Sequence, residues 1–323
     1  MNNNIINQLY LDENANIKYD NIIDYSQFIN KIRFNNMNNE IGEKSFYNRE
    51  DIRLITEEKY LSPNELGFNL FGKSFLRIGS CNRQIALKIF GAISNDKELN
   101  VFETIERNNL IKKQWEDKFE YCNLLKKLPE PEIKNIFGIN IKSFEKYLIK
   151  DVVREKEYVL MIKPINDTSY MIKETIFANK EIMNIHIPEI LMNIFYFKKP
   201  VKLLYVGKNN TELFVEHNIG IKDGYIIENG KEYKQYNITD LINDAIELQN
   251  LIEDKKIPNK NYLIDSQLKV TEISEMIKHK IINNKNGNAI LNGIENYTSF
   301  QCIDCKYRTI CQELGDGIFE FNY

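Results

Sequence analysis

The sequence has little of several features that would settle its class at once. Among 323 residues there are only 5 cysteines, 3 histidines and 1 tryptophan. It has no run of about 18 consecutive apolar residues, so we expect no membrane-spanning helix and no membrane partner. The N-terminus has no basic segment followed by an apolar one, so we expect no signal peptide. These absences predict a cytoplasmic protein in a reducing compartment, where clustered cysteines favour a metal over disulfides.

The chain also has no large excess of charge of either sign. Its 43 Lys and Arg and 46 Asp and Glu give a formal net charge of −3. Bulk electrostatics therefore do not indicate a nucleic-acid-binding protein, and any contact with DNA must come from a local basic patch. Heavy use of Asn, Ile and Lys is typical of an AT-rich genome. A phage or another mobile element is a plausible source, which would place the protein in the host cytoplasm.

The N-terminal part differs in composition from the rest. Residues 1–60 are rich in Asn with scattered aromatics, and we expect an extension of short helices packed on the main body. An arm that docks onto a partner is the alternative. Residues 61–323 form the main domain, because 43% hydrophobic residues suffice for a large core and no later boundary is visible.

Residue periodicity predicts the elements of this main domain. Ser62-Pro63 is typical of a helix start, and helices are predicted at 82–92, 97–127, 188–197, 239–252 and 270–283. Strands are predicted at 145–150, 157–165, 169–177, 201–206 and 211–217, with a turn at 166–168, a hairpin at 228–231 and a loop at 283–288. In the helix 97–127, an apolar stripe includes Cys122 as a small core residue. Together they predict the α/β or α+β class, a mixed sheet flanked by helices.

Four of the five cysteines form a candidate metal site. Cys302, Cys305 and Cys311 have the spacing C-x2-C-x5-C, and Cys81 lies far upstream. Thiolates favour tetrahedral zinc or an iron–sulfur cluster. Zinc sites usually come as two C-x2-4-C pairs, whereas one pair with two single cysteines suits a four-iron cluster better. We expect a 4Fe-4S cluster that ties the C-terminal tail to an N-terminal helix. Zinc, and an unrelated Cys81, stay open as alternatives.

The residues around these cysteines resemble a known family. Arg77, Ser80, Cys81, Arg83 and Gln84 are similar to the opening of the iron–sulfur RecB-like nucleases, which include CRISPR-associated adaptation nucleases and phage exonucleases. The tail also matches, because that family carries C-x2-C-x-Y-x3-C and this chain has the same pattern. The resemblance covers about residues 62–313. It implies a PD-(D/E)XK fold, a DNA substrate and catalytic Mg²⁺ or Mn²⁺.

The histidine that the resemblance implies is missing. In that family a His on the helix after the first cysteine commonly joins the metal ligands. Residues 108–115 contain none, and His186, His217 and His279 lie elsewhere. We expect these three to be surface or core residues.

The acidic residues of the family are also missing where they are expected. The family carries an Asp on the second core strand and an E-x-K element on the third. Aligned to strand 158–164, the Asp position holds Lys163, whose positive charge would repel Mg²⁺. Strand 169–175 has no E-x-K, and Glu145 is the only early acidic match.

A rearranged active centre stays possible as an alternative. Asp167 and Glu174 are seven residues apart across a tight turn, with Lys173 as the supporting lysine. Their ordinary interpretation is a turn residue and two solvent-facing charges.

Three functions compete on this basis. The favoured hypothesis is a nuclease-fold protein that has lost its catalytic centre and acts as a DNA-binding or accessory subunit of a larger complex. Its phosphate contacts would come from Arg83, Lys88, Lys306 and Arg308, close to the cysteines. The second is an active, Mg²⁺- or Mn²⁺-dependent DNA exonuclease with rearranged acids. The third is a structural component of a larger assembly without contact to DNA.

Overall fold

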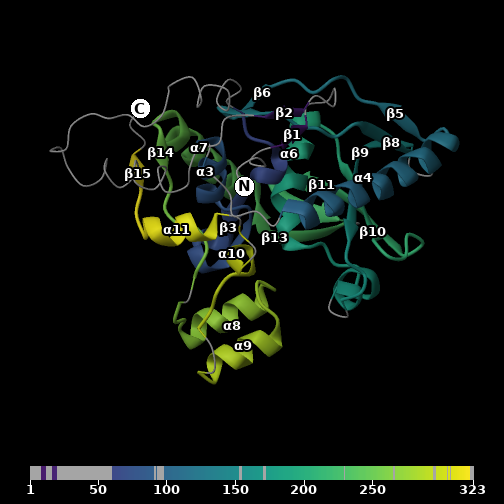
Figure 1. The fold of residues 1–323 in the computed structure, drawn as a ribbon. Coiled ribbons are helices and arrows are strands. Elements are labelled where there is room, and N and C mark those ends of the chain that lie inside the picture. The colour runs from purple at the N-terminus through teal and green to yellow at the C-terminus, as the bar shows by residue number, and fades with distance from the viewer. Residues whose placement is uncertain are drawn as a thin grey trace. The chain divides into compact units, whose positions relative to one another are not determined.

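The computed structural model describes residues 9–11, 17–19, 60–90, 92, 98–152, 155–169, 172–228, 230–264, 266–293, 296–303, 305 and 307–320 (Figure 1). The predicted extension at 1–60 lies outside the described residues, except for Tyr60 and the antiparallel strands β1 (Leu9–Leu11) and β2 (Ile17–Tyr19). The chain forms two compact units. The sheet unit comprises Tyr60–Lys73 and Leu99–Asn243, and the cysteine unit includes Ser74–Glu98 and Asp244–Tyr323. Residues 61–323, predicted as one domain, therefore fall into both units.

A mixed seven-stranded sheet forms the centre of the sheet unit, in the order β13-β12-β11-β10-β9-β8-β5. Its strands are β5 (Leu125–Lys127), β8 (Tyr147–Asp151), β9 (Lys156–Ile165), β10 (Val201–Gly207), β11 (Phe214–Lys222), β12 (Tyr225–Glu228) and β13 (Lys231–Asn237). β9 and β10 are parallel, and every other neighbouring pair is antiparallel. A separate hairpin joins β6 (Lys134–Ile136) and β7 (Ile139–Ile141).

The two parallel strands are the most apolar part of the sheet. All seven residues of β10 are buried, as expected for a central strand that is covered on both faces. On one face, Ile111 and Trp115 of α4 (Glu98–Tyr121) pack against Leu160 and Leu204. α6 (Ile187–Phe197) also packs on β9 and β10, through a predominantly apolar surface. The predicted mixed sheet with flanking helices is therefore confirmed.

The cysteine unit consists mainly of helices. Its elements are β4 (Arg77–Gly79), α3 (Asn82–Ile89), most of α7 (Ile238–Glu253), β14 (Lys256–Ile257), α8 (Val270–Lys278), α9 (Asn284–Leu291), α10 (Phe300–Ile303), α11 (Arg308–Leu314) and β15 (Phe319–Glu320). α3 and α11 share a core that contains Ala86, Leu87, Tyr307 and Ile310. β14 pairs with β15, so the tail is joined to the rest of the unit by backbone hydrogen bonds as well as by apolar contacts.

Short one-turn elements complete both units. These are η1 (Pro63–Glu65), η2 (Leu70–Gly72), η3 (Ser74–Leu76), η4 (Lys173–Ala178) and η5 (Asn184–His186), besides the strand β3 (Gly67–Asn69). The predicted helix start at Ser62-Pro63 is confirmed, because Ser62 precedes η1 and its amide donates to Glu65 at 3.1 Å. Within the described residues, no helix has both the length and the apolar composition needed to cross a membrane.

The prediction of one helix over 97–127 is wrong at its C-terminal end. α4 stops at Tyr121, Asn123 takes a positive φ of 54°, and Leu125 begins a strand that pairs with β8. Pairing with an existing sheet edge outweighs the continuing helical pattern of the sequence. Cys122 lies in this turn with an exposed side chain, so its prediction as a core residue is also wrong.

Two further local predictions are wrong. The strand predicted at 169–177 is wrong over its described second half, because Lys173–Ala178 form the π-helix η4. Residues 283–288 are not a loop, because they include the first half of α9. The Asn283 side chain accepts a hydrogen bond from the Asn286 amide, which starts α9 in spite of its Asn- and Gly-rich sequence.

Candidate functional site

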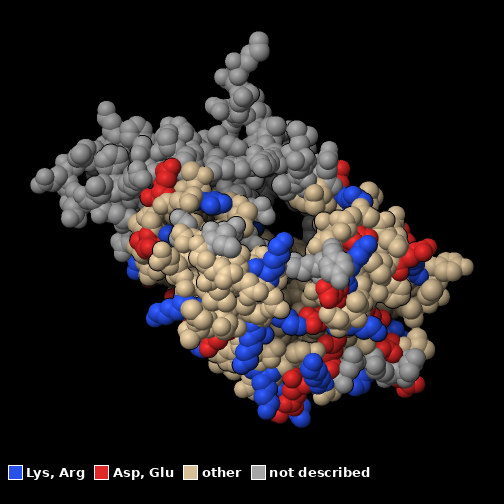
Figure 2. All heavy atoms as spheres, turned by 90° about the horizontal axis from the view of Figure 1, so that it is seen from below, with Lys and Arg blue, Asp and Glu red and all other residues tan. Residues whose placement is uncertain are grey.

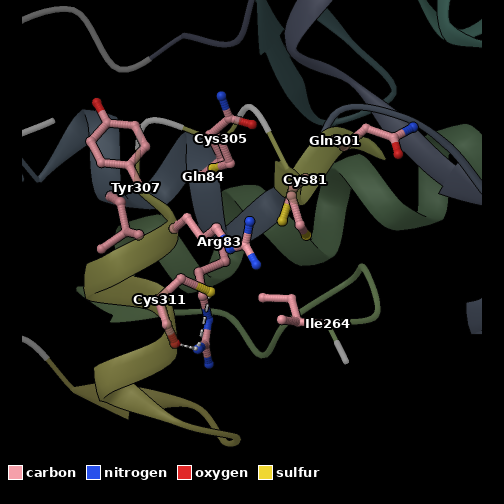
Figure 3. Close-up of a pocket in the computed structure, with 11 residues that line it drawn as sticks. Cys81, Arg83, Gln84, Ile264, Gln301, Cys305, Tyr307 and Cys311 are labelled. Carbon is pink, nitrogen blue, oxygen red and sulfur yellow. Dashed lines mark hydrogen bonds between the residues drawn. The ribbon is translucent and has the colours of Figure 1, made fainter. Parts of the chain in front are cut away.

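All four cysteines that were predicted as ligands line one small pocket of the cysteine unit (Figure 3). Cys81 caps the N-terminus of α3, Cys302 lies in α10, and Cys311 lies on α11. Cys305 lies between the last two helices and packs against the α3–α11 core. The fold therefore brings a residue from the N-terminal helix to the three residues of the tail, across more than two hundred positions of sequence.

The thiols influence one another electrostatically. Burial, together with the charges of the neighbouring Cys81, Cys305 and Cys311, raises the pKa of Cys302 to about 12. Burial also raises the pKa of Cys311, against the opposing positive charge of Arg83. A thiolate in this pocket consequently requires a compensating positive charge, which a bound metal supplies.

The four cysteines line the same pocket, but their side chains are not arranged as the ligands of one metal ion. Among the described residues, no group of three or more His, Cys, Asp or Glu side chains has the arrangement of a metal site. The donor set itself, four free cysteines that line one pocket, is of the type that soft metals prefer.

Arg83, which was predicted to contact phosphates, is a buried structural residue. Its side chain is fully buried, and its guanidinium donates to the carbonyl oxygens of Pro258 at 2.7 Å, Gly315 at 2.7 Å and Gly317 at 2.6 Å. A longer bond of 3.4 Å reaches the Cys311 carbonyl, and the Cys311 Sγ lies 3.8 Å away (Figure 3). A guanidinium that is already engaged in this way is not available to a phosphate, so this assignment is corrected.

Two of the other predicted phosphate contacts lie in the described part of the cysteine unit. Lys88 is half-buried on α3, and Arg308 is half-buried and lines the cysteine pocket. Lys306 lies outside the described residues. On the face drawn in Figure 2, Lys and Arg side chains are interspersed with Asp and Glu, in keeping with the small net charge.

A buried ion pair positions the segment that carries Cys81. Arg77 is 1% exposed and donates to both carboxylate oxygens of Asp244, at 2.8 and 3.0 Å. Asn82 accepts from Arg77 at 2.7 Å and donates to Asp244 at 2.9 Å. Arg77 precedes Cys81 in the sequence and Asn82 follows it, and both are bonded to Asp244. These bonds therefore hold the start of α3 against α7.

A second polar cluster lies in the sheet unit and is centred on Lys163. The Lys163 ammonium on β9 lies 2.6 Å from each oxygen of Glu189 on α6. Glu145, in the segment before β8, lies near both of them. Burial raises the pKa of Glu145 from 4.5 to about 7, with Lys163 opposing this and Glu189 adding to it. Of the weak catalytic candidates, Glu145 is one whose pKa its surroundings raise toward neutrality.

Two of the buried neighbours of this cluster, His186 and Met161, carry no charge. The His186 Nδ1 lies 2.8 Å from the Tyr205 hydroxyl, and burial with the charge of Lys163 lowers the pKa of His186 to about 3. Met161 lies two residues before Lys163 and is fully buried. Its sulfur accepts from Asn193 at 3.6 Å.

Glu145 also faces a cavity of about 200 Å³ in the sheet unit. Ser143, Lys134, Tyr196 and Phe197 are among the residues that line it. The Lys134 ammonium lies 4.5 Å from the ring centroid of Tyr196, in a cation–π contact with that ring. The cavity gives Glu145 access to small solutes.

The rearranged active centre receives no support from the geometry. Asp167 is 4% exposed and accepts from the Asn209 amide at 2.9 Å and from the Asn210 amide at 3.0 Å. Burial raises its pKa, but these hydrogen bonds prevail and the pKa of Asp167 is lowered. Glu174 and Lys173 are exposed on η4. Asp167 acts as a turn residue, as its ordinary interpretation predicted.

The remaining histidines do not join the Lys163 cluster. His217 is buried, and its Nδ1 contacts Glu228 on the neighbouring strand. His279 ends α8 in the cysteine unit. Glu189, by contrast, was missed by sequence reasoning. The sequence feature that could have indicated Glu189 is a carboxylate in the first turn of a predominantly apolar helix, on the face that is buried.

Titration of Glu145 should be visible in the stability of the protein. Because its folded-state pKa of about 7 exceeds its ordinary value of 4.5, the folded protein binds this proton more tightly than the unfolded chain. The resulting stabilisation, about 1–3 kcal/mol, is complete at acidic pH and is lost as the pH rises through neutrality. Urea unfolding of Glu145→Gln should lack this loss. The exposed Glu130→Gln is the control, and equal pH slopes for both variants would contradict the assignment.

Comparisons with known proteins give little more. No family model matches the chain, and no curated protein matches it. Among solved structures, the crystal structure of SSO0001 aligns with a TM-score of 0.36 and 13% identity, over 88% of this chain and 95% of that chain. Similarity at this level carries no argument about fold or function.

Proposed function

We propose that the protein is an iron–sulfur, RecB-like nuclease-fold protein whose catalytic centre is degenerate, and that it serves as a DNA-binding or accessory subunit in the cytoplasm. One observation carries the proposal. Lys163 on β9 is paired with Glu189 at 2.6 Å, and two residues before it the fully buried Met161 stands where the resemblance implies an acid. A site with so few oxygen ligands disfavours Mg²⁺ or Mn²⁺.

The order of elements supports the fold part of this proposal. Along the chain α4 is followed by β5, β8 and β9, then by α6 and β10. The first three strands are antiparallel neighbours, and β10 joins β9 in parallel. Counted in this way β8 is the second strand and β9 is the third, so the E-x-K element of the family belongs on β9 and not on 169–175.

This new alignment changes the interpretation of Lys163. Met161-Ile162-Lys163 would correspond to E-x-K, with methionine in place of the acid. Glu145, just before β8, would correspond to the Asp of the second strand. One carboxylate and the lysine are then retained, whereas the acid on β9 and the helical His are missing. A single carboxylate next to an ammonium holds a divalent cation poorly, because such a cation prefers several oxygen ligands.

The cysteine pocket would hold the cluster of the proposed family. Cys81, Cys302, Cys305 and Cys311 are its ligands in this proposal, and the group supplies structural cross-linking of the tail. The Arg83 guanidinium next to Cys311 Sγ compensates negative charge on the thiolates and fixes the backbone around them.

A nuclease assay tests the loss of activity. The purified protein is incubated with single-stranded and double-stranded DNA in the presence of Mn²⁺, and we expect no cleavage above that of a mock purification. Robust cleavage that disappears in Glu145→Ala or Asp167→Ala would overturn the proposal and favour the active exonuclease.

DNA binding separates the accessory role from a purely structural one. A mobility shift that weakens with salt is expected, with a further loss in Lys88→Gln and Arg308→Gln. Arg83 is unsuitable for this test because it is buried. Lys199→Gln, which removes a lysine of the sheet unit that pairs with Glu157, is the charge-matched control. Absence of any salt-dependent shift would favour a structural component without contact to DNA.

A further inference from the structure

The hairpin of β6 and β7 in the sheet unit has a buried face and a more exposed face. Ile139, Ile141 and Ser143 are buried, and the residues between and after them are not. Asn135 and Asn140 are directly opposite each other on the exposed face, and their side chains are hydrogen-bonded at 3.2 Å. Because residues two positions apart in a strand share a face, the hairpin face is made of Ile133, Asn135, Phe137, Asn140, Lys142 and Phe144.

Aromatic side chains are prominent on the hairpin face. Phe137 is 54% and Phe144 is 43% exposed, although phenylalanine is one of the most often buried residues. Tyr60 lies beside β7, since the amide of the next residue, Leu61, donates to the Asn140 carbonyl at 2.8 Å. The Tyr60 ring centroid is 6.2 Å from that of Phe144. The face therefore offers Phe137 at its tip and a Tyr60–Phe144 pair at its base.

The turn holds Phe137 in a conformation that aromatic residues rarely adopt. Phe137 and Gly138 form a two-residue turn with φ of 53° and 87°, where Asn and Gly are usual. The Gly138 amide donates to the Asn135 side chain at 3.1 Å, and the Phe137 ring packs against Phe195 of α6 with 5.3 Å between centroids. The exposed ring is thus already fixed, so a ligand that stacks on it immobilises little that was free before.

The charge around these rings is positive. Residues 133–144 include Lys134 and Lys142 and no Asp or Glu. The Lys142 ammonium lies 5.1 Å from the Tyr60 ring centroid and 5.6 Å from that of Phe144. A protein partner with an apolar surface would have to bury this ammonium, which costs free energy, whereas the phosphates of a nucleic acid pair with it. Exposed rings next to a lysine are the groups that hold single-stranded nucleic acids.

We infer that the hairpin face is a stacking platform for single-stranded DNA. Bases stack on Phe137 and on the Tyr60–Phe144 pair, and Lys142 contacts the phosphates between them. A duplex is a poor ligand, because its bases are already stacked on one another. The inference rests on the DNA-binding role proposed above and names the form of DNA and the surface. It does not involve the cysteine pocket.

Binding of a labelled oligothymidylate of about 20 nucleotides, longer than the site of one such platform, tests the inference on the full chain. Fluorescence anisotropy should show about tenfold weaker binding for Phe137→Ala and for Phe144→Ala. Tyr121→Ala is the matched control, because it removes a ring that is 89% exposed at the end of α4, and it should bind as wild type. An unlabelled duplex should compete poorly.

A tryptophan at the tip reports stacking directly, also where an alanine variant fails to fold. Phe137→Trp should keep its affinity, and oligothymidylate should quench its fluorescence, whereas Tyr121→Trp should show no quenching. The single native tryptophan, Trp115, is 8% exposed and gives a constant background. Unquenched Phe137→Trp fluorescence while the wild-type protein binds DNA overturns this inference alone. A wild-type protein that binds neither form of DNA rejects the proposed DNA-binding role together with it.

Discussion

Replacing Asp244 with Ala is expected to lower the free energy of unfolding by about 3–5 kcal/mol, because it removes the carboxylate that accepts from both terminal nitrogens of a buried guanidinium. Arg77 is 1% exposed, and both of its terminal nitrogens donate to Asp244. The Ser80 carbonyl and the Asn82 side chain also accept from Arg77, but neither of them carries a negative charge. Chemical denaturation followed by circular dichroism measures the loss.

Two further variants make this result interpretable. Asp117→Ala removes the carboxylate of an exposed ion pair with Lys113 and should cost less than about 1 kcal/mol. The double variant Arg77→Met/Asp244→Leu should be less destabilised than Asp244→Ala, since no charge is left buried. If Asp244→Ala is as stable as Asp117→Ala, the ion pair does not fix the start of α3.

The second large effect concerns the four cysteines. With the proposed iron–sulfur cluster, Cys305→Ser should abolish metal binding and visible absorbance, whereas Cys122→Ser should retain both, because Cys122 is exposed and lies in the sheet unit. The binding free energy of a structural metal is on the order of 10 kcal/mol and is available only to the folded tail. Limited proteolysis should therefore cut around α10 and α11 in Cys305→Ser first.

The metal content of the purified wild-type protein decides among the alternatives. A brown preparation with iron and sulfide supports the iron–sulfur cluster, and a colourless preparation with one zinc per chain supports zinc. A protein that contains neither, prepared without oxygen, contradicts a metal in this pocket.

Sequence reasoning predicted the elements whose pattern is local. The helix after Cys81, the buried strand at 201–206 and the helix 188–197 were all found, because each has a strong period or a continuous apolar run. Strand β5 was missed, since its three residues continue a helical pattern and become a strand only by pairing with β8. Helix α9 was missed because its Asn and Gly residues favour loops, and the Asn283 cap was not recognised.

The candidate sites show the same limit. Spacing alone grouped the four cysteines, which the fold brings to one pocket. It could not show that Arg83 faces inward, because a basic residue near a helix start is exposed in most proteins. Nor could it pair Lys163 with Glu189, which are 26 residues apart and meet only because α6 packs back on β9.

The buried Arg83 has a consequence for how a metal would be lost and regained. Its bonds to Gly315 and Gly317 hold the end of the tail to α3 and β14 through contacts that involve no sulfur. If a metal left the pocket, these bonds would still hold the C-terminal end of the segment that carries the three tail cysteines. The tail thiols would therefore stay at a high effective concentration near Cys81. Rebinding of a metal would then require closing only a short loop, which costs little entropy. Arg83→Met should thus slow reconstitution of the centre more than it weakens the assembled one.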